Sequence, residues 1–168
     1  MLESAINVSK LRGLSGLTLW ASKHYVYSKA GFLINDNSLF SEVTNLSACF
    51  VPVTTDEIIL EKMENYPPFA MGAYKFYLSG ACLTVIEIKE GIAIADFEGE
   101  NKKLLKIIRS KLPDKFYINS FSDDQILFEL KSNGFNVDIC PQKLQMWLKF
   151  NDFDINNINC RIKVLDRI

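Results

Sequence analysis

Residues 71–98, MGAYKFYLSGACLTVIEIKEGIAIADFE, decide the fold. Two short breaks, Ser79-Gly80 and Glu90-Gly91, divide this stretch into three apolar-rich segments. Segments rich in β-branched and aromatic residues, separated by two-residue breaks that contain glycine, are typical of strands joined by tight hairpins. We therefore expect an antiparallel meander of three strands, over about 71–78, 81–89 and 92–98.

The residues that follow indicate a connection back to the same sheet. Lys102–Leu112 carries leucine and isoleucine at helical spacing, and Pro113 ends the helix because proline cannot continue it. Phe116–Ile118 then predicts a short strand. A strand, a helix and a second strand in this order are typical of a right-handed parallel crossover, so we expect a mixed sheet.

A second helix and two closing strands are expected further on. Residues 122–125, SDDQ, match a capping box in which the serine caps the helix and the glutamine reaches back. Asn133-Gly134 supplies a left-handed end to this helix. Strands near Phe135–Cys140 and Leu144–Phe150 complete the order β-β-β-α-β-α-β-β. The predicted fold class is α+β with a mixed central sheet.

The first seventy residues follow a less regular pattern. Leu17–Trp20 and Phe32–Ile34 are typical of strands, with a short helix capped by Ser22 between them and a turn at residues 35–37. Residues 54–57, TTDE, match a second capping box, which predicts a helix that ends before a proline. Further strands are expected at Phe50–Val53 and at the alternating tail Asn159–Asp166.

The length of 168 residues fits one domain. We expect a single domain over 1–168, in which residues 1–70 form an irregular part of uncertain role and residues 71–150 form the core. The chain is 48% apolar and 23% charged, which is typical of a globular protein and excludes a disordered one.

The charge balance excludes several partners. Lys and Arg number 19 and Asp and Glu number 20, so no overall basic field exists to hold nucleic acid or an anionic membrane. No apolar run approaches the roughly 20 residues that span a bilayer. Met1–Ala5 lacks the basic region and apolar core of a secretory signal, so a cytoplasmic location is expected.

The histidine and cysteine residues do not form a pattern typical of a metal site or a redox motif. The only histidine is His24, and no two of the four cysteines stand in a Cys-x-x-Cys spacing. We therefore expect no metal site. Cys49 and Cys82 lie in apolar runs, where a thiol behaves as a small hydrophobic side chain.

The segment Phe128–Phe135, with the strands after it, resembles the C-terminal end of the GNAT superfamily of N-acetyltransferases. In that family a helix ends in a Tyr-x-Lys-x-Gly-Phe-like signature before two closing strands. The order of elements over residues 71–150, about half the chain, is similar as well. Tyr27-Ser28-Lys29-Ala30-Gly31-Phe32 matches the same signature. This makes the N-terminal region a remnant of a second acetyltransferase-like half, an element that completes the sheet by an unusual connection, or a coincidence.

The resemblance implies acetyl-coenzyme A as cofactor. In the family a Gly-rich loop before the crossover helix holds the pyrophosphate with backbone N–H groups and the helix N-terminus. Here residues 98–103, EGENKK, contain one glycine, and Glu98 and Glu100 would repel a pyrophosphate while the lysines partly offset this. The implied cofactor-binding residues are Gly99, Asn101, Lys102 and Lys103.

Asp96 and Glu98 are the candidate catalytic carboxylates. Their i, i+2 spacing puts them on one face of a strand, where a carboxylate can deprotonate an amine. The alternative is that they are solvated charges at a strand end. The family's tyrosine acid falls near Leu130, which cannot donate a proton. Tyr27 is the alternative acid, with His24 as a base, if the N-terminal signature is functional.

Two functions follow as hypotheses. The first is a divergent acyl-coenzyme A-dependent N-acyltransferase that transfers an acetyl group directly to a small-molecule or peptide amine. The second is a non-catalytic GNAT-like protein that acts as a binding or self-association module. Strand addition at the tail edge, Asn159–Asp166, would suit a homodimer.

Overall fold

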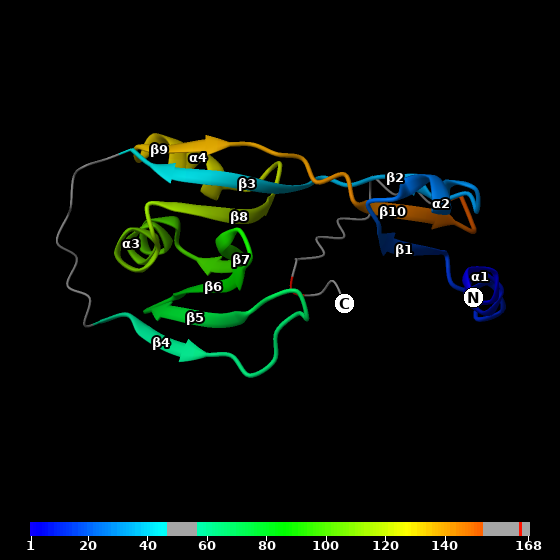
Figure 1. Ribbon diagram of the computed structural model, residues 1–168, viewed down its shortest axis with the longest axis horizontal. Coiled ribbons are helices and arrows are strands. Elements are labelled where there is room, and N and C mark those ends of the chain that lie inside the picture. Colours follow the sequence, from blue (N-terminus) through cyan, green and yellow to red (C-terminus); the bar gives the residue numbers. More distant parts are fainter. Residues whose placement is uncertain (47–56, 153–164, 166–168) are drawn as a thin grey trace. The chain divides into compact units, whose positions relative to one another are not determined.

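In the computed structural model the chain forms two compact units (Figure 1). The larger unit consists of Ser38–Pro141 together with Ile162–Ile168, and the smaller unit combines Met1–Asn37 with Gln142–Arg161. The structure describes residues 1–46, 57–152 and 165. The strands expected at 50–53 and 159–166 therefore lie outside the described residues, apart from Leu165. The single domain stays a prediction, because contacts alone do not measure whether the two units unfold together.

The larger unit is built on a seven-stranded mixed sheet of order β4-β5-β6-β7-β8-β3-β9. Its strands are β3 (Ser38–Asn45), β4 (Ile59–Lys62), β5 (Gly72–Leu78), β6 (Ala81–Ile88), β7 (Gly91–Gly99), β8 (Lys115–Phe121) and β9 (Phe135–Asp138). β5, β6 and β7 pair antiparallel, which confirms the meander. β7 and β8 pair in parallel, which confirms the β-α-β crossover and the mixed α+β sheet.

Two helices, α3 (Asn101–Lys111) and α4 (Gln125–Ser132), pack into one core on the same face of this sheet. The buried positions of α3 are Leu104, Leu105, Ile107 and Ile108, and those of α4 are Ile126, Leu127 and Leu130. The Arg109 guanidinium donates a hydrogen bond to the Asn133 carbonyl at 2.5 Å and lies over the Phe135 ring. This contact ties α3 to the end of α4.

Two expected helix starts are corrected by the structure. α4 is capped by Asp124 rather than by Ser122, and the Asp124 carboxylate accepts the Phe121 N–H at 2.7 Å, which turns the chain as it leaves β8. The helix expected after residues 54–57 is wrong, because Ile59–Lys62 form β4. Ile59 and Leu60 are exposed, so no core is available to a helix there, whereas the edge of β5 offers backbone partners.

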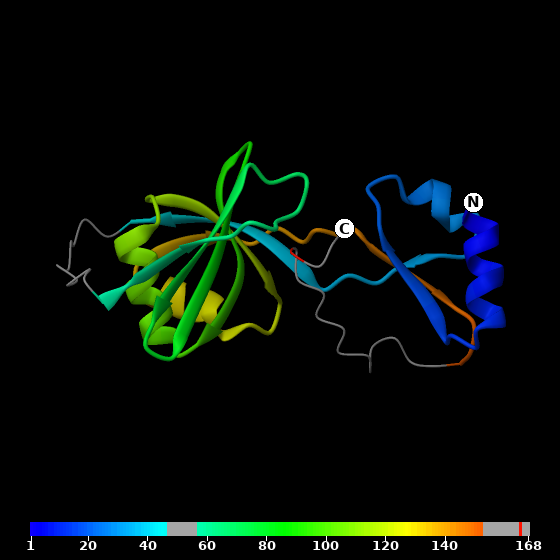
Figure 2. The same cartoon turned by 90° about the horizontal axis from the view of Figure 1, so that it is seen from below.

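The smaller unit contains a three-stranded sheet of order β1-β10-β2. Its elements are α1 (Leu2–Leu11), β1 (Gly16–Trp20), α2 (His24–Ser28), β2 (Leu33–Ile34) and β10 (Gln145–Lys149). The expected helix between two strands is confirmed, but its N-cap is Lys23 rather than Ser22. α1 and β3 were not predicted. The sheet joins segments from distant parts of the chain (Figure 2). The Asp36 carboxylate accepts the N–H groups of Leu144 and Gln145 at 2.7 and 2.9 Å, which anchors the start of β10.

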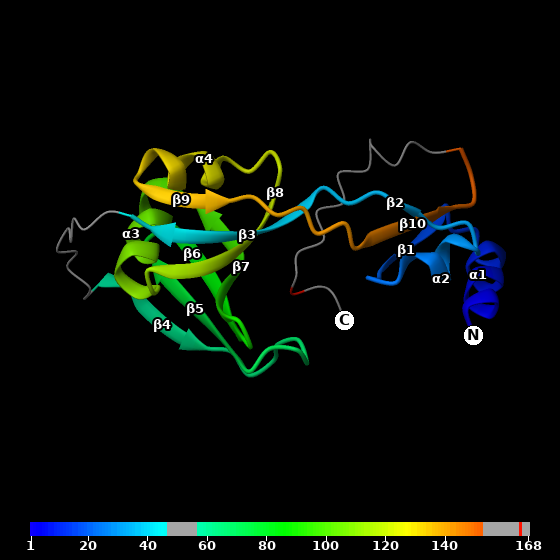
Figure 3. The same ribbon diagram turned by 45° about the horizontal axis from the view of Figure 1, so that its top comes forward.

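The two sheets repeat one arrangement of elements. In the larger unit β8 and β9 are joined through α4, and β3 lies between them and antiparallel to both (Figure 3). In the smaller unit β1 and β2 are joined through α2, and β10 lies between them in the same way. Each helix ends in a glycine of positive φ, Gly134 or Gly31, followed by a buried phenylalanine. A further helix precedes the first strand in each case.

Candidate functional site

The meander carries a polar pocket on the face opposite α3. Leu83 and Val85 of β6 belong to the core beneath α3, so Cys82 and Thr84, which alternate with them, face the other side. A pocket of about 150 Å³ opens on that side. It is lined by Met63, Lys75, Cys82, Thr84, Asp96, Phe97, Glu98 and Leu165.

A β-bulge turns the two predicted carboxylates into this pocket. Thr84 pairs with Asp96, but the next residue of β6, Val85, pairs with Ile94, so Ala95 is an extra residue in β7. Ile94 is buried in the core beneath α3. In a regular strand Asp96 would face the same way as Ile94, because side chains repeat every two residues. The bulge shifts that alternation and directs Asp96 and Glu98 to the opposite face.

The structure therefore brings Asp96 and Glu98 together on one wall. Both line the pocket, so they share one face of β7, as their spacing predicted. The Asp96 carboxylate also accepts its neighbour's backbone N–H, from Phe97, at 2.6 Å, which fixes its direction. Asp96 is half-buried and Glu98 is exposed. A carboxylate in such a place can accept a proton from a bound ammonium group.

Sequence reasoning missed two other polar residues of the pocket. Lys75 of β5 pairs with Thr84 of β6, which pairs in turn with Asp96 of β7. The three form a polar row across the meander. The alternation of Cys82 and Thr84 with Leu83 and Val85 was the available signal, because it puts both polar side chains on the face opposite that of the two core residues.

The pKa of Cys82 is affected by the charges of both signs that line the pocket. Burial raises the pKa of Cys82, and the carboxylates of Glu98 and Asp96 raise it further. The Lys75 ammonium and a hydrogen bond with Thr84 act in the opposite direction. On the neighbouring strand the Tyr77 hydroxyl donates to Glu61 at 3.0 Å, and this hydrogen bond raises the pKa of Tyr77.

The parallel strands stop pairing beside this pocket. Their register consists of Ala93 with Tyr117 and Ile94 with Ile118, although β7 continues to Gly99 and β8 to Phe121. Beyond that point of β8 the Ser120 hydroxyl is buried, and among the described residues it has no hydrogen-bond partner. The end of the parallel pair thus holds a buried hydroxyl without a hydrogen-bond partner among the described residues, which is uncommon in folded proteins.

The predicted cofactor loop is short and closely packed. Gly99 has a φ of 101°, and a Cβ atom there would lie 2.1 Å from the Gly80 carbonyl oxygen, so only glycine fits against the β5–β6 turn. Glu100 caps α3, and its carbonyl accepts the N–H groups of Lys103 and Leu104 at 3.0 Å each. Asn101 is the first residue of the helix, which puts its N–H at the helix N-terminus.

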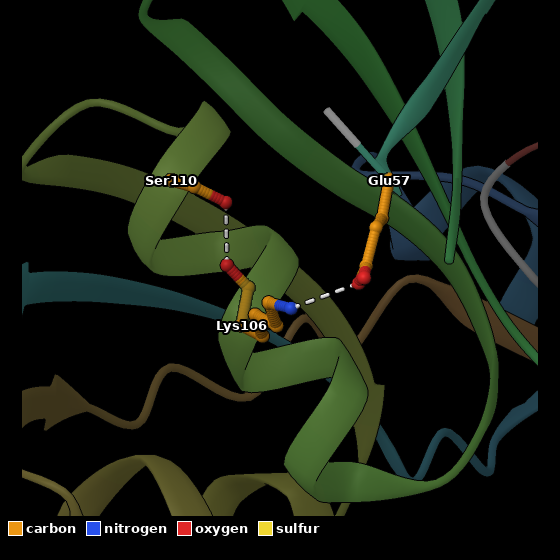
Figure 4. A network of polar contacts seen from close by, with 3 residues as sticks. All are labelled: Glu57, Lys106 and Ser110. Carbon is orange, nitrogen blue, oxygen red and sulfur yellow. Dashed lines mark hydrogen bonds and ion pairs between the residues drawn. The ribbon is translucent and has the colours of Figure 1, made fainter. Parts of the chain in front are cut away.

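The lysines of α3 are not equivalent. The Lys103 ammonium lies 3.4 Å from the Glu100 carboxylate, so part of its charge is already compensated. Lys106 pairs with Glu57 at 3.2 Å, and its carbonyl accepts the Ser110 hydroxyl at 2.6 Å (Figure 4). Lys102 is exposed. Lys102 and Lys103 are therefore the two cations that the first turn of α3 offers.

Tyr27, the third predicted catalytic residue, lies in α2 of the smaller unit, outside the sheet that carries Asp96 and Glu98. Its ring meets the Phe32 ring edge-on at 6.2 Å between centroids, and Phe32 is fully buried. The Nε2 atom of His24 is buried and has no hydrogen-bond partner among the described residues. A catalytic role for Tyr27 stays a prediction. At the corresponding position of α4, Leu130 is fully buried in the core.

Among the residues that the structure describes, no three His, Cys, Asp or Glu side chains gather in a way that could hold a metal ion. Within the same residues no helix is long and apolar enough to cross a membrane.

No protein-family model matches the sequence, and no curated protein is significantly similar to it. Solved structures do share the fold. A GCN5-related N-acetyltransferase from Anabaena variabilis aligns with a TM-score of 0.57 at 12% identity, over 89% of this chain and 50% of that one. One from Kribbella flavida aligns with a TM-score of 0.52 at 6% identity, over 87% and 46%.

A third match is an Enterococcus faecalis protein described as a conserved protein of unknown function and probable N-acyltransferase. It aligns with a TM-score of 0.55 at 11% identity, over 88% of this chain and 48% of that one. The chain thus spans about half the length of the solved proteins that it matches. The predicted GNAT-like fold is confirmed, and at these identities the likeness extends to the fold alone.

Proposed function

We propose that the protein is a divergent N-acyltransferase that moves an acyl group from acyl-coenzyme A to an amine. The observation that carries the proposal is the coincidence of two features at one place. β7 and β8 stop pairing after Ile94 and Ile118, and the bulge beside that point turns Asp96 and Glu98 into a pocket. Ligands of open sheets commonly bind beyond the carboxyl ends of such parallel strands.

The proposed chemistry needs one proton acceptor near the amine. Asp96 is the stronger candidate, because it is half-buried and its direction is fixed by the Phe97 N–H. Glu98 stands on the same wall and holds the ammonium form of the substrate by charge. Acyl-coenzyme A, when bound, would supply a thioester, whose carbonyl carbon an uncharged amine can attack. In this proposal Asp96 accepts the proton and Glu98 binds the ammonium group.

The residues at the end of the parallel pair suit an anionic cofactor. The N-terminus of α3 has the polarity that favours phosphate, with Asn101 as its first residue. Lys102 and Lys103 add positive charge, and Gly99 lets the loop pack against the β5–β6 turn. These residues would hold acetyl-coenzyme A.

Isothermal titration with acetyl-coenzyme A tests the proposal directly. We expect micromolar binding that is weakened in the double variant Lys102→Glu, Lys103→Glu. A matched control, Lys89→Glu with Lys131→Glu, makes the same change of net charge at exposed positions away from the loop. Absence of heat at millimolar ligand, together with an unshifted melting temperature, would remove the enzyme proposal.

A second function is favoured by a different observation. The Glu100 carboxylate compensates part of the Lys103 charge, and the Gly80 backbone packs against Gly99. Less positive charge and less space are therefore left in this loop for a pyrophosphate. These features suit a GNAT-like protein without catalysis, which binds a protein partner or forms a homodimer. A molecular mass measured by light scattering at several concentrations tests self-association. Under either function we place the protein in a reducing cytoplasm, where the unpaired thiols of Cys82 and Cys140 would persist.

A further inference from the structure

The pocket on the meander carries opposite charges on opposite walls. Lys75 stands on β5, and Asp96 and Glu98 stand on β7, with β6 between them. Neighbouring strands lie about 4.8 Å apart, so the two charged walls rise from backbones about 10 Å apart. The pocket thus separates a cationic side from an anionic side across a distance that a small molecule can span.

The floor and rim of the pocket leave little else for a ligand to recognise. Thr84 lies between the two charged walls and is almost fully buried. The charges of Lys75, Glu98 and Asp96 all contribute to the pKa of Cys82, which lines the same pocket. The remaining lining residues are apolar: Met63, Phe97 and Leu165. A pocket of about 150 Å³ limits the bound group to a few heavy atoms.

We propose that the amine acceptor is a small amino acid or a close analogue, a primary amine that also carries a carboxylate. The inference rests on the proposed function and names its substrate class. The ammonium faces Asp96 and Glu98, and the carboxylate faces Lys75. A diamine would place a second cation against Lys75, and a simple alkylamine would leave the Lys75 charge without a partner.

The transfer step balances with these groups. The ammonium gives one proton to the carboxylate of Asp96, and the resulting amine nitrogen attacks the thioester carbonyl carbon. A C–N bond forms and the C–S bond breaks. The nitrogen loses its second proton to the departing thiolate, so the products are the N-acyl amino acid and the free thiol. Lys75 takes no part in bond making, and its role is to orient the acceptor.

The test measures binding of the acceptor alone, by titration followed with NMR, so that it does not depend on the cofactor. The probes are 4-aminobutyrate, butylamine and butyrate, which share one carbon chain. We expect 4-aminobutyrate to bind at least about tenfold more tightly than either single-charge analogue, as one lost charge-assisted contact implies. Equal or tighter binding of butylamine would overturn the proposal.

Two variants of Lys75 sharpen the result. Lys75→Met should abolish the preference for 4-aminobutyrate, and Lys75→Glu should create a preference for 1,4-diaminobutane, while Lys89→Met serves as an exposed control. A preference that survives Lys75→Met would also overturn the proposal. If 4-aminobutyrate binds as expected but is not acylated when acetyl-coenzyme A is added, the acyltransferase proposal fails, and the pocket remains a binding site for a small amino acid without being an acceptor site. If butylamine is acylated as well as 4-aminobutyrate, the acceptor assignment fails alone.

Discussion

The two units pair nearly the same elements and differ in what covers them. In the larger unit α3 precedes β8, and its four buried side chains pack against the meander. In the smaller unit α1 precedes β1, but the one buried residue of α1 is Ser9. Val8, Leu11 and Leu14 are exposed there by 47%, 88% and 46%. The strand-helix-strand motif and its inserted strand therefore form without a meander. The helix that precedes the motif is buried only where a meander is present.

The ends of the two motifs are alike in detail. Phe32 follows Gly31 and is 1% exposed, and Phe135 follows Gly134 and is 4% exposed. Each phenylalanine meets another aromatic ring edge-on, Tyr27 in the smaller unit and Phe116 in the larger. This agreement gives the interpretation of residues 1–37 as a second acetyltransferase-like half more support than the six-residue signature alone.

The largest expected effects come from these two phenylalanines. Phe32→Ala and Phe135→Ala should each lower the free energy of unfolding by about 3–5 kcal/mol, because each leaves a cavity in a packed site. Urea unfolding gives the total, and hydrogen exchange of the β10 and β9 amides assigns the loss to one unit. A Phe32→Ala cost below about 1 kcal/mol would break the comparison, because it would mean that the smaller unit has no true core.

The next effect separates the two preceding helices. Ile107→Ala in α3 should cost about 2–5 kcal/mol, since Ile107 is fully buried. Val8→Ala in α1 should change stability by no more than about 0.5 kcal/mol, because it removes exposed methyl groups. Both variants are measured by thermal and urea unfolding. A large cost at Val8 would show that α1 is covered in solution.

A smaller effect is expected at the helix ends. Gly31→Ala and Gly134→Ala should each cost about 1–2 kcal/mol, because φ values of 91° and 85° strain any residue with a Cβ atom. Gly31→Ala should be the worse of the two, since the new methyl group would lie 3.2 Å from a Leu148 methyl carbon. Equal melting temperatures for wild type and both variants would contradict the assigned turn.

The smallest effect concerns thiol reactivity. Cys82 has a raised pKa through burial, so at neutral pH less of it is thiolate than in a solvated thiol. Iodoacetamide should therefore modify the exposed Cys140 several-fold faster than Cys82. The modification rate at Cys82 should keep rising at pH values above the ordinary pKa of a cysteine thiol. Peptide mass spectrometry follows each site. Faster labelling at Cys82 would mean that the pocket activates the thiol.

Most of the larger unit was predictable because its signals are local. The meander breaks at Ser79-Gly80 and the periodic apolar residues of Lys102–Leu112 each report one element without reference to the rest of the chain. β4 was mistaken for a helix because a four-residue edge strand exists only through its pairing with β5. No local pattern reveals a partner that lies elsewhere in the chain.

Only the part of the candidate site that depends on one strand's own sequence was predictable. The spacing of Asp96 and Glu98 showed that they share a face, but which face depends on the bulge at Ala95. That bulge is a matter of register between two strands, which one strand's sequence does not contain. Lys75 enters the pocket only through the pairing of β5 with β6. The buried hydroxyl of Ser120 likewise follows from the place where two strands separate.

The insertion of β10 between β1 and β2 has a consequence for how the protein is made. A ribosome delivers α1, β1, α2 and β2 before the larger unit, but the strand that belongs between β1 and β2 comes after residue 144. The larger unit, whose core runs from Ser38 to Pro141, is synthesised in between. The edges of β1 and β2 that face β10 therefore stay uncovered until the residues up to Lys149 have been synthesised. Residues 1–37 would acquire their final structure only after the larger unit's Ser38–Pro141 has been made.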